Sequence, residues 1–465
     1  MSWTTPTSVE STESRPGPEG TRALRRWVPS RPDALSLATL PGRRLGAVVT
    51  VRDWTVIVSD PVAVVRDPGD LDDLGRRCGW RDEPLEGFPP FVGGAVGYLT
   101  DECAAAWLHL PPDRRPHRGG IESMHFGVYD HAVCIPPDGD GSWLVATDFP
   151  GWSRDPIEAR LDRLQGDLTA LAPIARPPSP LKSPPPQLSL DVAAHHAAVA
   201  RIREWIAAGD LYQLNLTLQM SVPWGRGGVE LARRLWAASP SAAHAAWLDV
   251  GQAHIVSISP ETFLRTDADA VSVRPIKGTR PRSPDPATDT AAGQALRASD
   301  KDRAEHVMIV DLERNDLGQV CETGSVHVTE LMVLERFPTV WHLTSTVVGA
   351  LSDSVELTDM LRATFPCGSV TGAPKRMAVA RIRAVEPVRR GVYCGAVGVI
   401  SRGIVDLSVA IRTAVLEDGV ARYGTGGGIV ADSDPEAEFE EAMDKAEAFL
   451  TAVGADRPRA KSPRQ

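Results

Sequence analysis

The sequence predicts an α+β protein, because candidate strands outnumber candidate helices and do not alternate with them as βαβ units would. Short apolar runs separated by turn residues fill the first third of the chain, as they do in strand-rich regions. Further along, LYQLNLTLQM (211–220) alternates apolar and polar residues, which is typical of a strand with one polar face. Just before it, apolar residues at helical spacing over 192–208, followed by Gly209, predict a helix.

Composition divides the chain into five expected segments. Residues 1–30 are polar and contain Pro and Gly, which predicts a disordered tail. Residues 31–172 are expected to form an N-terminal strand-rich subdomain, and the proline run PPSPLKSPPP predicts a linker over 173–190. We expect a catalytic domain over 191–455 and a second disordered tail over 456–465.

The remaining elements of the catalytic segment follow from the same patterns. Strands are expected over 253–259, 270–274, 395–400, 405–413 and 420–424. Helices are expected over about 299–318, 356–364, 374–385 and 435–452. In the N-terminal segment, PFVGGAVGYL (90–99) holds three glycines in an apolar run, which indicates a tightly packed strand or bend.

Charge and cysteine usage exclude several classes of protein. The net charge is −10 and no basic stripe is present, which argues against a nucleic-acid-binding surface. The six cysteines are scattered without a CxxC pair, as is typical of a reducing compartment. The polar N-terminus lacks the apolar core of a secretory signal, and no run approaches the ~18 apolar residues of a membrane span. We therefore expect a soluble, cytoplasmic protein.

Two pairs of acidic residues have a spacing that suits a metal site. Glu438 and Glu441 lie one helical turn apart in the C-terminal helix, and Asp302 and Glu305 repeat that spacing in another helix. Either pair alone is more simply a solvated acidic face. Two pairs that face each other would supply hard oxygen ligands suited to Mg²⁺, and the sequence leaves open whether they do.

Lysine is rare in this chain, which has only six lysines among its 50 basic residues. Lys277 lies in RPIKGTR between Arg274 and Arg280, and neighbouring cations depress the pKa of a lysine. A lysine with a depressed pKa can act as a nucleophile at neutral pH. The alternative is an exposed lysine at the end of a strand.

Two glycine-rich segments are candidates for binding an anion. Gly426, Gly427 and Gly428 are expected in a loop between a strand and the acidic helix, where they would offer backbone N–H groups unless they form only a hairpin or bulge. FPCGSVTGAPK (365–375) is a similar loop that leads into a helix. Neither has the spacing of a P-loop, so a nucleotide is not implied.

Nine segments stand in order over residues 209–446. They are GDLYQLNL, SPETF, RPIKGT, KDRAEHVMIVDLERNDL, HLTSTVVG, FPCGSVTGAPK, RRGVYCGAVG, AIRT and GGGIVADSDPEAEFEEAMDKA. Together they resemble the chorismate-binding enzyme family, which includes aminodeoxychorismate, anthranilate, isochorismate and salicylate synthases. The resemblance covers essentially everything after the linker. Cys367 departs from the family pattern, which more often has Gly or Pro at that position.

The resemblance implies a two-layer sandwich of large antiparallel sheets flanked by helices, as in anthranilate synthase component I, with chorismate bound in a cleft between the sheets. It implies Mg²⁺ as the cofactor, held by Glu305 and Glu441 with Glu438 and Asp302 as companion acids. It also implies a set of substrate-binding residues: Thr279, His342, Ser369, Tyr393, Arg412, Gly426, Gly427, Gly428 and Lys445.

Lys277 distinguishes the branches of this family, since aminodeoxychorismate synthases typically have lysine where anthranilate synthases have alanine. The resemblance is therefore to aminodeoxychorismate synthase component I, which converts chorismate and ammonia to 4-amino-4-deoxychorismate for p-aminobenzoate and folate or for specialised metabolites. It implies Lys277 as nucleophile and Glu261 as general acid and base. No cysteine lies in a glutaminase context, so a separate glutamine amidotransferase subunit is the expected source of ammonia. The alternatives are anthranilate synthase component I and a catalytically inactive chorismate-binding paralogue.

Overall fold

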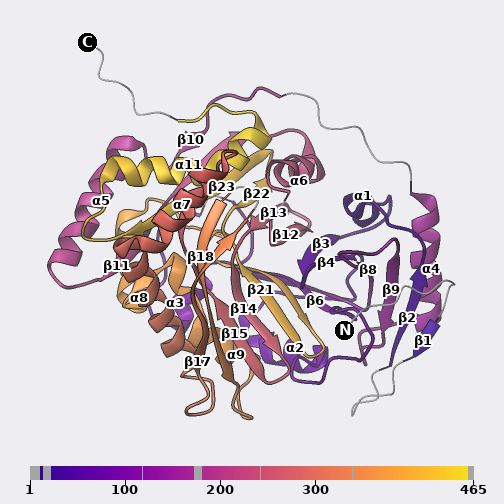
Figure 1. Ribbon diagram of the computed structural model, residues 1–465. Coiled ribbons are helices and arrows are strands. Elements are labelled where there is room, and N and C mark those ends of the chain that lie inside the picture. Colours follow the sequence, from indigo (N-terminus) through magenta and orange to yellow (C-terminus); the bar gives the residue numbers. More distant parts are fainter. Residues whose placement is uncertain are drawn as a thin grey trace.

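The computed structural model describes residues 11–13, 22–117, 119–171, 181–240, 242–337 and 340–458. Its strands form two large sheets in which the paired strands are antiparallel (Figure 1). In spatial order the first sheet contains β1 (Ser11–Glu13), β2 (Ala23–Val28), β9 (Ser142–Thr147), β8 (His131–Ile135), β4 (Trp54–Val58), β3 (Ala47–Val51), β12 (His244–Asp249), β13 (Ala253–Ser259), β22 (Thr413–Glu417), β23 (Val420–Ile429), β11 (Gln213–Pro223) and β10 (Gln187–Leu188), with β19 (Gly372–Ala373) also paired to β11.

The second sheet lies against the first. In spatial order it contains β16 (Ile276–Pro281), β18 (Val340–Ala350), β15 (Ala270–Arg274), β14 (Thr262–Asp267), β21 (Ile404–Val409), β20 (Ala396–Ser401), β6 (Gly94–Leu99), β7 (Met124–Tyr129) and β5 (Ala63–Val65), with β17 (His327–Arg336) also paired to β18.

Helices cover the outer faces of both sheets. Those on the first sheet are α1 (Ala34–Ala38), α4 (Ile157–Ala170), α5 (Val192–Ala207), α6 (Gly227–Ala238), α10 (Lys375–Val385) and α11 (Pro435–Val453). Those on the second are α2 (Leu71–Cys78), α3 (Cys103–Trp107), α8 (Asp300–Leu317) and α9 (Leu357–Thr364), while α7 (Pro286–Ala298) lies against β16 and β18. Two short 3₁₀ turns are η1 (Pro68–Asp70) and η2 (Gly368–Val370).

The three largest apolar clusters among the described residues hold these layers together. One lies between the sheets, where Val49 of β3 and Val399 of β20 belong to the same cluster. The other two join the outer face of each sheet to its helices. Burial of apolar surface is the main force that favours folding, so these contacts stabilise the packing of the layers. The expected sandwich of two antiparallel sheets flanked by helices is confirmed.

The segments on either side of the proline run share both sheets. β3 pairs with β12, so that Val49 opposes Ala246, and β6 pairs with β20, so that Val96 opposes Val399. The strand-rich N-terminal segment and the catalytic segment therefore contribute to the same cores. Of the expected linker, residues 173–180 lie outside the described residues, and β10 forms near its end.

The prediction of a disordered tail over 1–30 is corrected at β2, which lies within it. β2 pairs with β9 so that Leu24 opposes Ala146, and its two ends are buried while Arg25 and Arg26 are half-buried. Its partner is distant in the chain, which is why the local pattern did not reveal the strand. Residues 1–10 and 14–21 lie outside the described residues.

The C-terminal tail expected over 456–465 is described only as far as residue 458. Within that part, Arg457 forms ion pairs with Glu440 and Asp444 of α11, both at 2.6 Å. The beginning of this segment therefore contacts the last helix.

Most expected elements of the catalytic segment are confirmed. The bounds of α5, α8, α9, α10 and α11 each agree with the expected ones to within one residue, and β13 and β15 agree fully. The expected strand over 405–413 is instead two strands, β21 and β22, because the chain bends at Arg412, whose φ is 51°. The expected glycine loop is also corrected, since Gly426, Gly427 and Gly428 lie inside β23 and pair with β11.

Candidate active site

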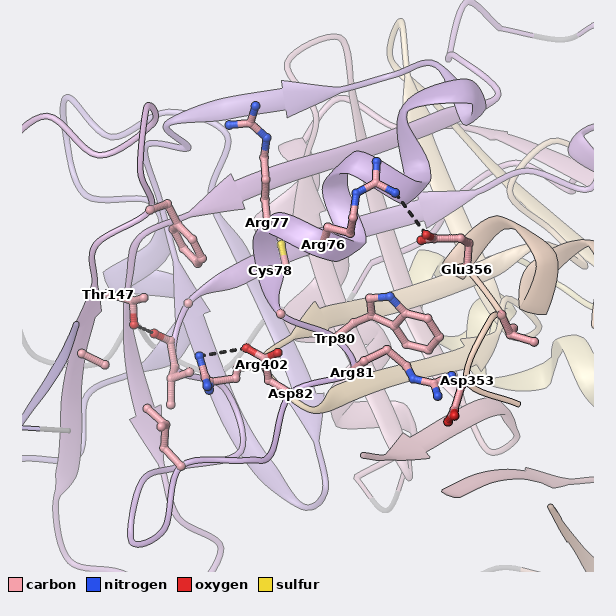
Figure 2. Close-up of a pocket in the computed structure, with 17 residues that line it drawn as sticks. Arg76, Arg77, Cys78, Trp80, Arg81, Asp82, Thr147, Asp353, Glu356 and Arg402 are labelled. Atoms are coloured by element: carbon pink, nitrogen blue, oxygen red, sulfur yellow. Dashed lines mark hydrogen bonds and ion pairs between the residues drawn. The ribbon is translucent and has the colours of Figure 1, made fainter. Parts of the chain in front are cut away.

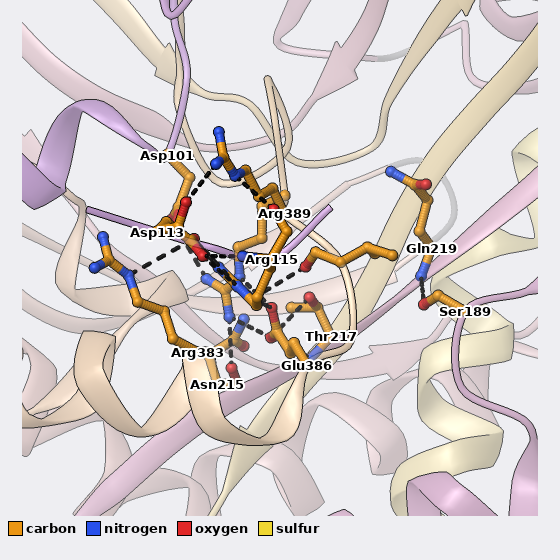
Figure 3. A network of polar contacts seen from close by, with 12 residues as sticks. Asp101, Asp113, Arg115, Ser189, Asn215, Thr217, Gln219, Arg383, Glu386 and Arg389 are labelled. Atoms are coloured by element: carbon orange, nitrogen blue, oxygen red, sulfur yellow. Dashed lines mark hydrogen bonds and ion pairs between the residues drawn. The ribbon is translucent and has the colours of Figure 1, made fainter. Parts of the chain in front are cut away.

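β11 and β23 lie side by side in the first sheet, with Leu216 opposite Gly427. The polar face of β11 is buried rather than exposed, since Asn215 and Thr217 are each 5% exposed. Glu386 accepts hydrogen bonds from the Thr217 backbone N–H and hydroxyl at 3.0 and 2.9 Å (Figure 3). Arg390 donates to the Asn215 carbonyl at 2.8 Å. This buried network fixes β11 and the segment that leads to Tyr393.

Lys277 lies in β16 with its side chain mostly buried. Its Nζ lies 3.0 Å from Glu305 Oε1 and donates to the Ser369 carbonyl oxygen at 3.3 Å. Burial acts to lower the pKa of Lys277, but the carboxylates of Glu305, Glu261 and Glu441 outweigh it and hold the pKa above its ordinary value. The resting form of this side chain is therefore an ammonium paired with Glu305.

The expectation that Arg274 and Arg280 depress the pKa of Lys277 is wrong. Arg274 forms an ion pair with Glu335, and Arg280 pairs with Asp302 at 2.8 Å. Both guanidinium charges are thus engaged by other carboxylates, and acidic groups dominate the surroundings of Nζ.

Glu261 follows β13 and is 4% exposed. Burial raises the pKa of its carboxyl, against the opposing effects of the Ser369 hydroxyl and the Lys277 ammonium. Its Oε1 has no hydrogen-bond partner among the described residues. A buried carboxyl with a raised pKa retains its proton more readily, which is the property that a general acid needs.

Three carboxylates from two helices converge on the glycines of β23. Glycine has no Cβ, but a Cβ placed at Gly428 would lie 2.9 Å from Oε1 of Glu305 in α8, so this carboxylate lies directly over the strand. A Cβ on Gly427 would lie 3.4 Å from Glu438 Oε2 and 3.5 Å from Glu441 Oε1, both in α11. The two acidic helices therefore approach each other at this strand. Asp302, the fourth predicted acid, is instead engaged by Arg280.

Polar partners hold these carboxylates in place. Gln213 Nε2 donates to Glu305 Oε1 at 3.1 Å, and Ser433 Oγ donates to Glu438 Oε1 at 2.6 Å. Neither partner was predicted as a site residue. The polar face of β11 was the available signal for Gln213, whereas nothing in the sequence distinguishes Ser433 from other loop serines.

The carboxylates suit a hard divalent cation such as Mg²⁺. Two ammonium groups already lie against them, Lys277 at 3.0 Å from Glu305 and Lys445 at 2.7 Å from Glu441, and they neutralise part of the negative charge that would attract a metal ion. Within the described ranges, no three acidic, His or Cys side chains close on a single point. Mg²⁺ needs only one or two carboxylates, with water and substrate oxygens completing its octahedron. The donor set therefore fits Mg²⁺, provided that the carboxylates turn away from the lysines.

Positive and neutral polar groups occupy another part of the site. Burial lowers the pKa of His342 to about 4. The charges of Arg412 and Lys445 lower it further, whereas the hydrogen bond to the Gly278 backbone acts to raise it. His342 is therefore neutral at pH 7, and its Nδ1 lies 3.0 Å from Thr279 Oγ1. These groups can receive a substrate carboxylate by charge and by hydrogen bonding.

Tyr393 packs directly on β23. A Cβ on Gly424 would lie 2.2 Å from the Tyr393 ring, so that the absence of a side chain at Gly424 makes room for it. Tyr393 is 8% exposed, and burial raises the pKa of its hydroxyl well above the ordinary value, so it remains a hydrogen-bond donor.

Two glycines of β23 offer a matched test of this geometry. In Gly426→Ala the new Cβ would lie 2.0 Å from the Leu216 carbonyl oxygen, so we expect a loss of roughly 1–3 kcal/mol of stability. In Gly427→Ala the nearest atoms are the carboxylate oxygens and the Lys445 ammonium at 3.4–3.5 Å, so the fold should persist while substrate binding weakens. Thermal unfolding checks both variants, and equal unfolding temperatures would contradict the geometry.

A cavity of about 330 Å³ lies in another part of the molecule, beside α2 (Figure 2). None of the predicted site residues lines it. Its arginines are engaged by acids, as Arg76 pairs with Glu356 at 3.3 Å and Arg402 with Asp82 at 3.0 Å. The cavity therefore does not offer unpaired positive charge to an anionic ligand.

All six cysteines are buried free thiols. Among the described residues, no helix combines the length and the apolar character that crossing a membrane requires.

The chorismate binding enzyme family matches residues 68–451 of this chain. The fold and the site thus define the class, and the chain belongs to this family of chorismate-binding enzymes. Its similarity to individual members falls on two branches. Anthranilate synthase component 1 of Streptomyces coelicolor is 42% identical over 386 residues, which are 80% of this chain and 74% of that protein. Aminodeoxychorismate synthase component 1 of Salmonella typhimurium is 37% identical over 404 residues, which are 87% of this chain and 84% of that protein.

A solved structure supports the same assignment. Anthranilate synthase component I from Streptococcus pneumoniae superposes with a TM-score of 0.75 at 29% identity, covering 89% of this chain and 93% of that one. The fold is thus that of the component I enzymes.

Proposed function

We propose that this chain is the chorismate-aminating component of an aminodeoxychorismate synthase, which forms 4-amino-4-deoxychorismate from chorismate and ammonia. The observation that carries the proposal is the position of the Lys277 ammonium group among the residues of the site. Its Nζ lies against Glu305 and the Ser369 carbonyl, with Glu261 close enough to influence its charge. A lysine amine at this position can form a covalent bond to the substrate ring.

In the proposed reaction, Lys277 Nζ attacks ring carbon 2 while the 4-hydroxyl leaves carbon 4. Glu261 gives its proton to the departing oxygen, and water is released. Ammonia then attacks carbon 4, the bond between Nζ and carbon 2 breaks, and a proton from the incoming nitrogen returns to Glu261. Before the attack, Nζ passes one ammonium proton to water and leaves Glu305, and the freed amine takes a proton back from water at the end of the cycle.

The other site residues would bind and orient chorismate. Mg²⁺ held by Glu305 and Glu441, with Glu438 beside them, would supply positive charge to the ring carboxylate. Arg412 and Tyr393 would receive the enolpyruvyl carboxylate. The remaining residues proposed to line the pocket are Thr279, His342, Ser369, Gly426, Gly427, Gly428 and Lys445.

The metal assignment predicts a loss of cation binding when a carboxylate is neutralised. Glu441→Gln is expected to weaken Mg²⁺ binding roughly 10–100-fold, because a charged oxygen ligand is replaced by a neutral one. Calorimetric titration of the protein with Mg²⁺ measures this without reference to activity. Asp444→Asn is the matched control, since Asp444 lies on the same helix and pairs with Arg457. Equal Mg²⁺ affinity in both variants would contradict the assignment.

We propose that ammonia comes from a separate glutamine amidotransferase, as the name component 1 of the relatives suggests. The protein alone should then use ammonium but not glutamine. Glutamine-dependent turnover by the isolated chain would contradict this arrangement.

Anthranilate synthase component I is the second candidate, because the Streptomyces coelicolor relative at 42% identity has that name. Identification of the product by mass and fluorescence, after incubation with chorismate, Mg²⁺ and ammonium, separates the two. We expect 4-amino-4-deoxychorismate. Accumulation of anthranilate would overturn the proposed function, and chorismate binding without turnover would indicate an inactive paralogue.

A further inference from the structure

One carboxylate oxygen of Glu305 lies against two donors. Gln213 Nε2 donates to Glu305 Oε1 at 3.1 Å, and the Lys277 ammonium lies 3.0 Å from the same oxygen. The two donors differ in charge, because the ammonium neutralises the carboxylate whereas the amide is neutral and leaves the negative charge in place. The contact with Gln213 is therefore the one that can persist when a cation binds Glu305.

Backbone contacts fix Gln213, which is the first residue of β11. Gln213 pairs with Ala373 of β19, and a Cβ placed at Gly372, whose φ is 131°, would lie 2.3 Å from the Gln213 carbonyl oxygen. A Cβ placed at Gly428 would lie 2.1 Å from Gln213 Nε2, so the absence of a side chain there makes room for the amide. The amide is thus held over β23 and beside Glu305.

The segment that holds Gln213 also contacts the other donor. Residues 369–373 run from the Ser369 carbonyl, which accepts a hydrogen bond from Lys277 Nζ at 3.3 Å, to β19. Gln213 is held through its backbone, whereas Lys277 reaches Glu305 with the end of a long side chain. The lysine can therefore leave the carboxylate while the glutamine remains.

The stability of the fold does not explain an amide at this position. Gln213 is 0% exposed, and its Oε1 has no hydrogen-bond partner among the described residues. A buried carbonyl without a partner lowers the stability of the folded state. An apolar side chain of similar length would avoid this effect, and it would lack the N–H that Gln213 donates to Glu305.

We propose that Gln213 is a positioning residue for the metal site, which keeps Glu305 oriented toward Mg²⁺ once Lys277 has left that carboxylate. The neutral amide holds Oε1 without competing for its charge. The inference rests on the proposed function, in which Glu305 holds Mg²⁺ and Lys277 moves to the substrate. Gln213 itself takes part in no chemical step.

Gln213→Met tests this role by calorimetric titration of the protein with Mg²⁺ in the absence of chorismate. Methionine keeps the length of the side chain but has no N–H, so we expect the Mg²⁺ affinity to fall about tenfold. The unfolding temperature should stay the same or rise, because a buried carbonyl without a partner is removed. Gln219→Met is the matched control, since Gln219 lies on the same strand and its Oε1 also lacks a partner among the described residues. It should leave the Mg²⁺ affinity unchanged.

The same substitution in a Glu305→Gln background shows whether Gln213 acts through Glu305. If it does, Gln213→Met should cause no further loss of Mg²⁺ affinity there, because the two residues act as one unit. A purely structural role predicts instead an equal loss in both backgrounds and a lower unfolding temperature. Because the role concerns metal affinity, saturating Mg²⁺ should also restore most of the kcat for chorismate consumption in Gln213→Met.

Three results would overturn the role of Gln213. They are an unchanged Mg²⁺ affinity in Gln213→Met, an equal loss in the two backgrounds, and a loss that accompanies a clearly lower unfolding temperature. If Glu305→Gln binds Mg²⁺ as tightly as the unaltered protein, Glu305 is not a ligand and the role is overturned with that assignment. The titrations contain no chorismate, so a product other than 4-amino-4-deoxychorismate would overturn the proposed function and leave them valid.

Discussion

Lys277→Ala is expected to lower the rate of chorismate amination on the order of 10³-fold or more, because it removes the proposed nucleophile. Lys277→Arg keeps a cation beside Glu305 but supplies no nucleophilic amine, so it should be similarly inactive. Lys182→Ala removes a lysine from outside the site and should leave the rate unchanged. The measurement is the initial rate of 4-amino-4-deoxychorismate formation with saturating ammonium.

Retained activity would lead to a different conclusion for each of the two Lys277 variants. Full amination by Lys277→Ala would show that ammonia attacks without a covalent step. Activity in Lys277→Arg alone would show that Lys277 acts through its charge, by holding Glu305 or the substrate in place.

Glu261→Gln is expected to lower kcat roughly 10²–10⁴-fold, since the buried carboxyl can no longer give a proton to the departing hydroxyl. KM for chorismate should change little, because the amide has nearly the same shape as the carboxyl of Glu261, which is 4% exposed. Glu330→Gln, in β17, is the control for a glutamate outside the site. A kcat equal to that of the control would exclude Glu261 as the general acid.

Local patterns predicted the elements that depend on local forces. The alternation in β11 and the start of the C-terminal helix at residue 435 were readable because strand periodicity and helix-forming patterns act over a few residues. In the structure, Asp434 caps α11 by accepting a hydrogen bond from the Ala437 backbone N–H. The fold class followed from the same kind of information.

Long-range pairing explains the elements that were missed. β2 depends on β9, and the strand character of Gly426–Gly428 depends on β11, which pairs with them despite the low strand propensity of glycine. These partners are far away in the sequence. No short window can therefore show that the strands form.

The candidate site shows the same division between local and long-range information. Helical spacing indicated Glu305, Glu438 and Glu441 as candidate metal ligands. Their convergence on β23 depends on the tertiary fold and could not be predicted from that spacing. The charge state of Lys277 was mispredicted from its arginine neighbours in sequence. In space the nearest charges are carboxylates, and they change the sign of the effect on its pKa.

The proposed reaction depends most on a covalent bond between Lys277 and chorismate. The direct measurement is the mass of the protein, and of its Lys277-containing peptide, after reaction with chorismate and Mg²⁺ in the absence of ammonia and a rapid acid quench. We expect a gain equal to chorismate less one water, located on Lys277 and lost when ammonium is added before the quench. An unmodified Lys277 in protein that forms 4-amino-4-deoxychorismate at the full rate, with no adduct at any quench time, would contradict the account.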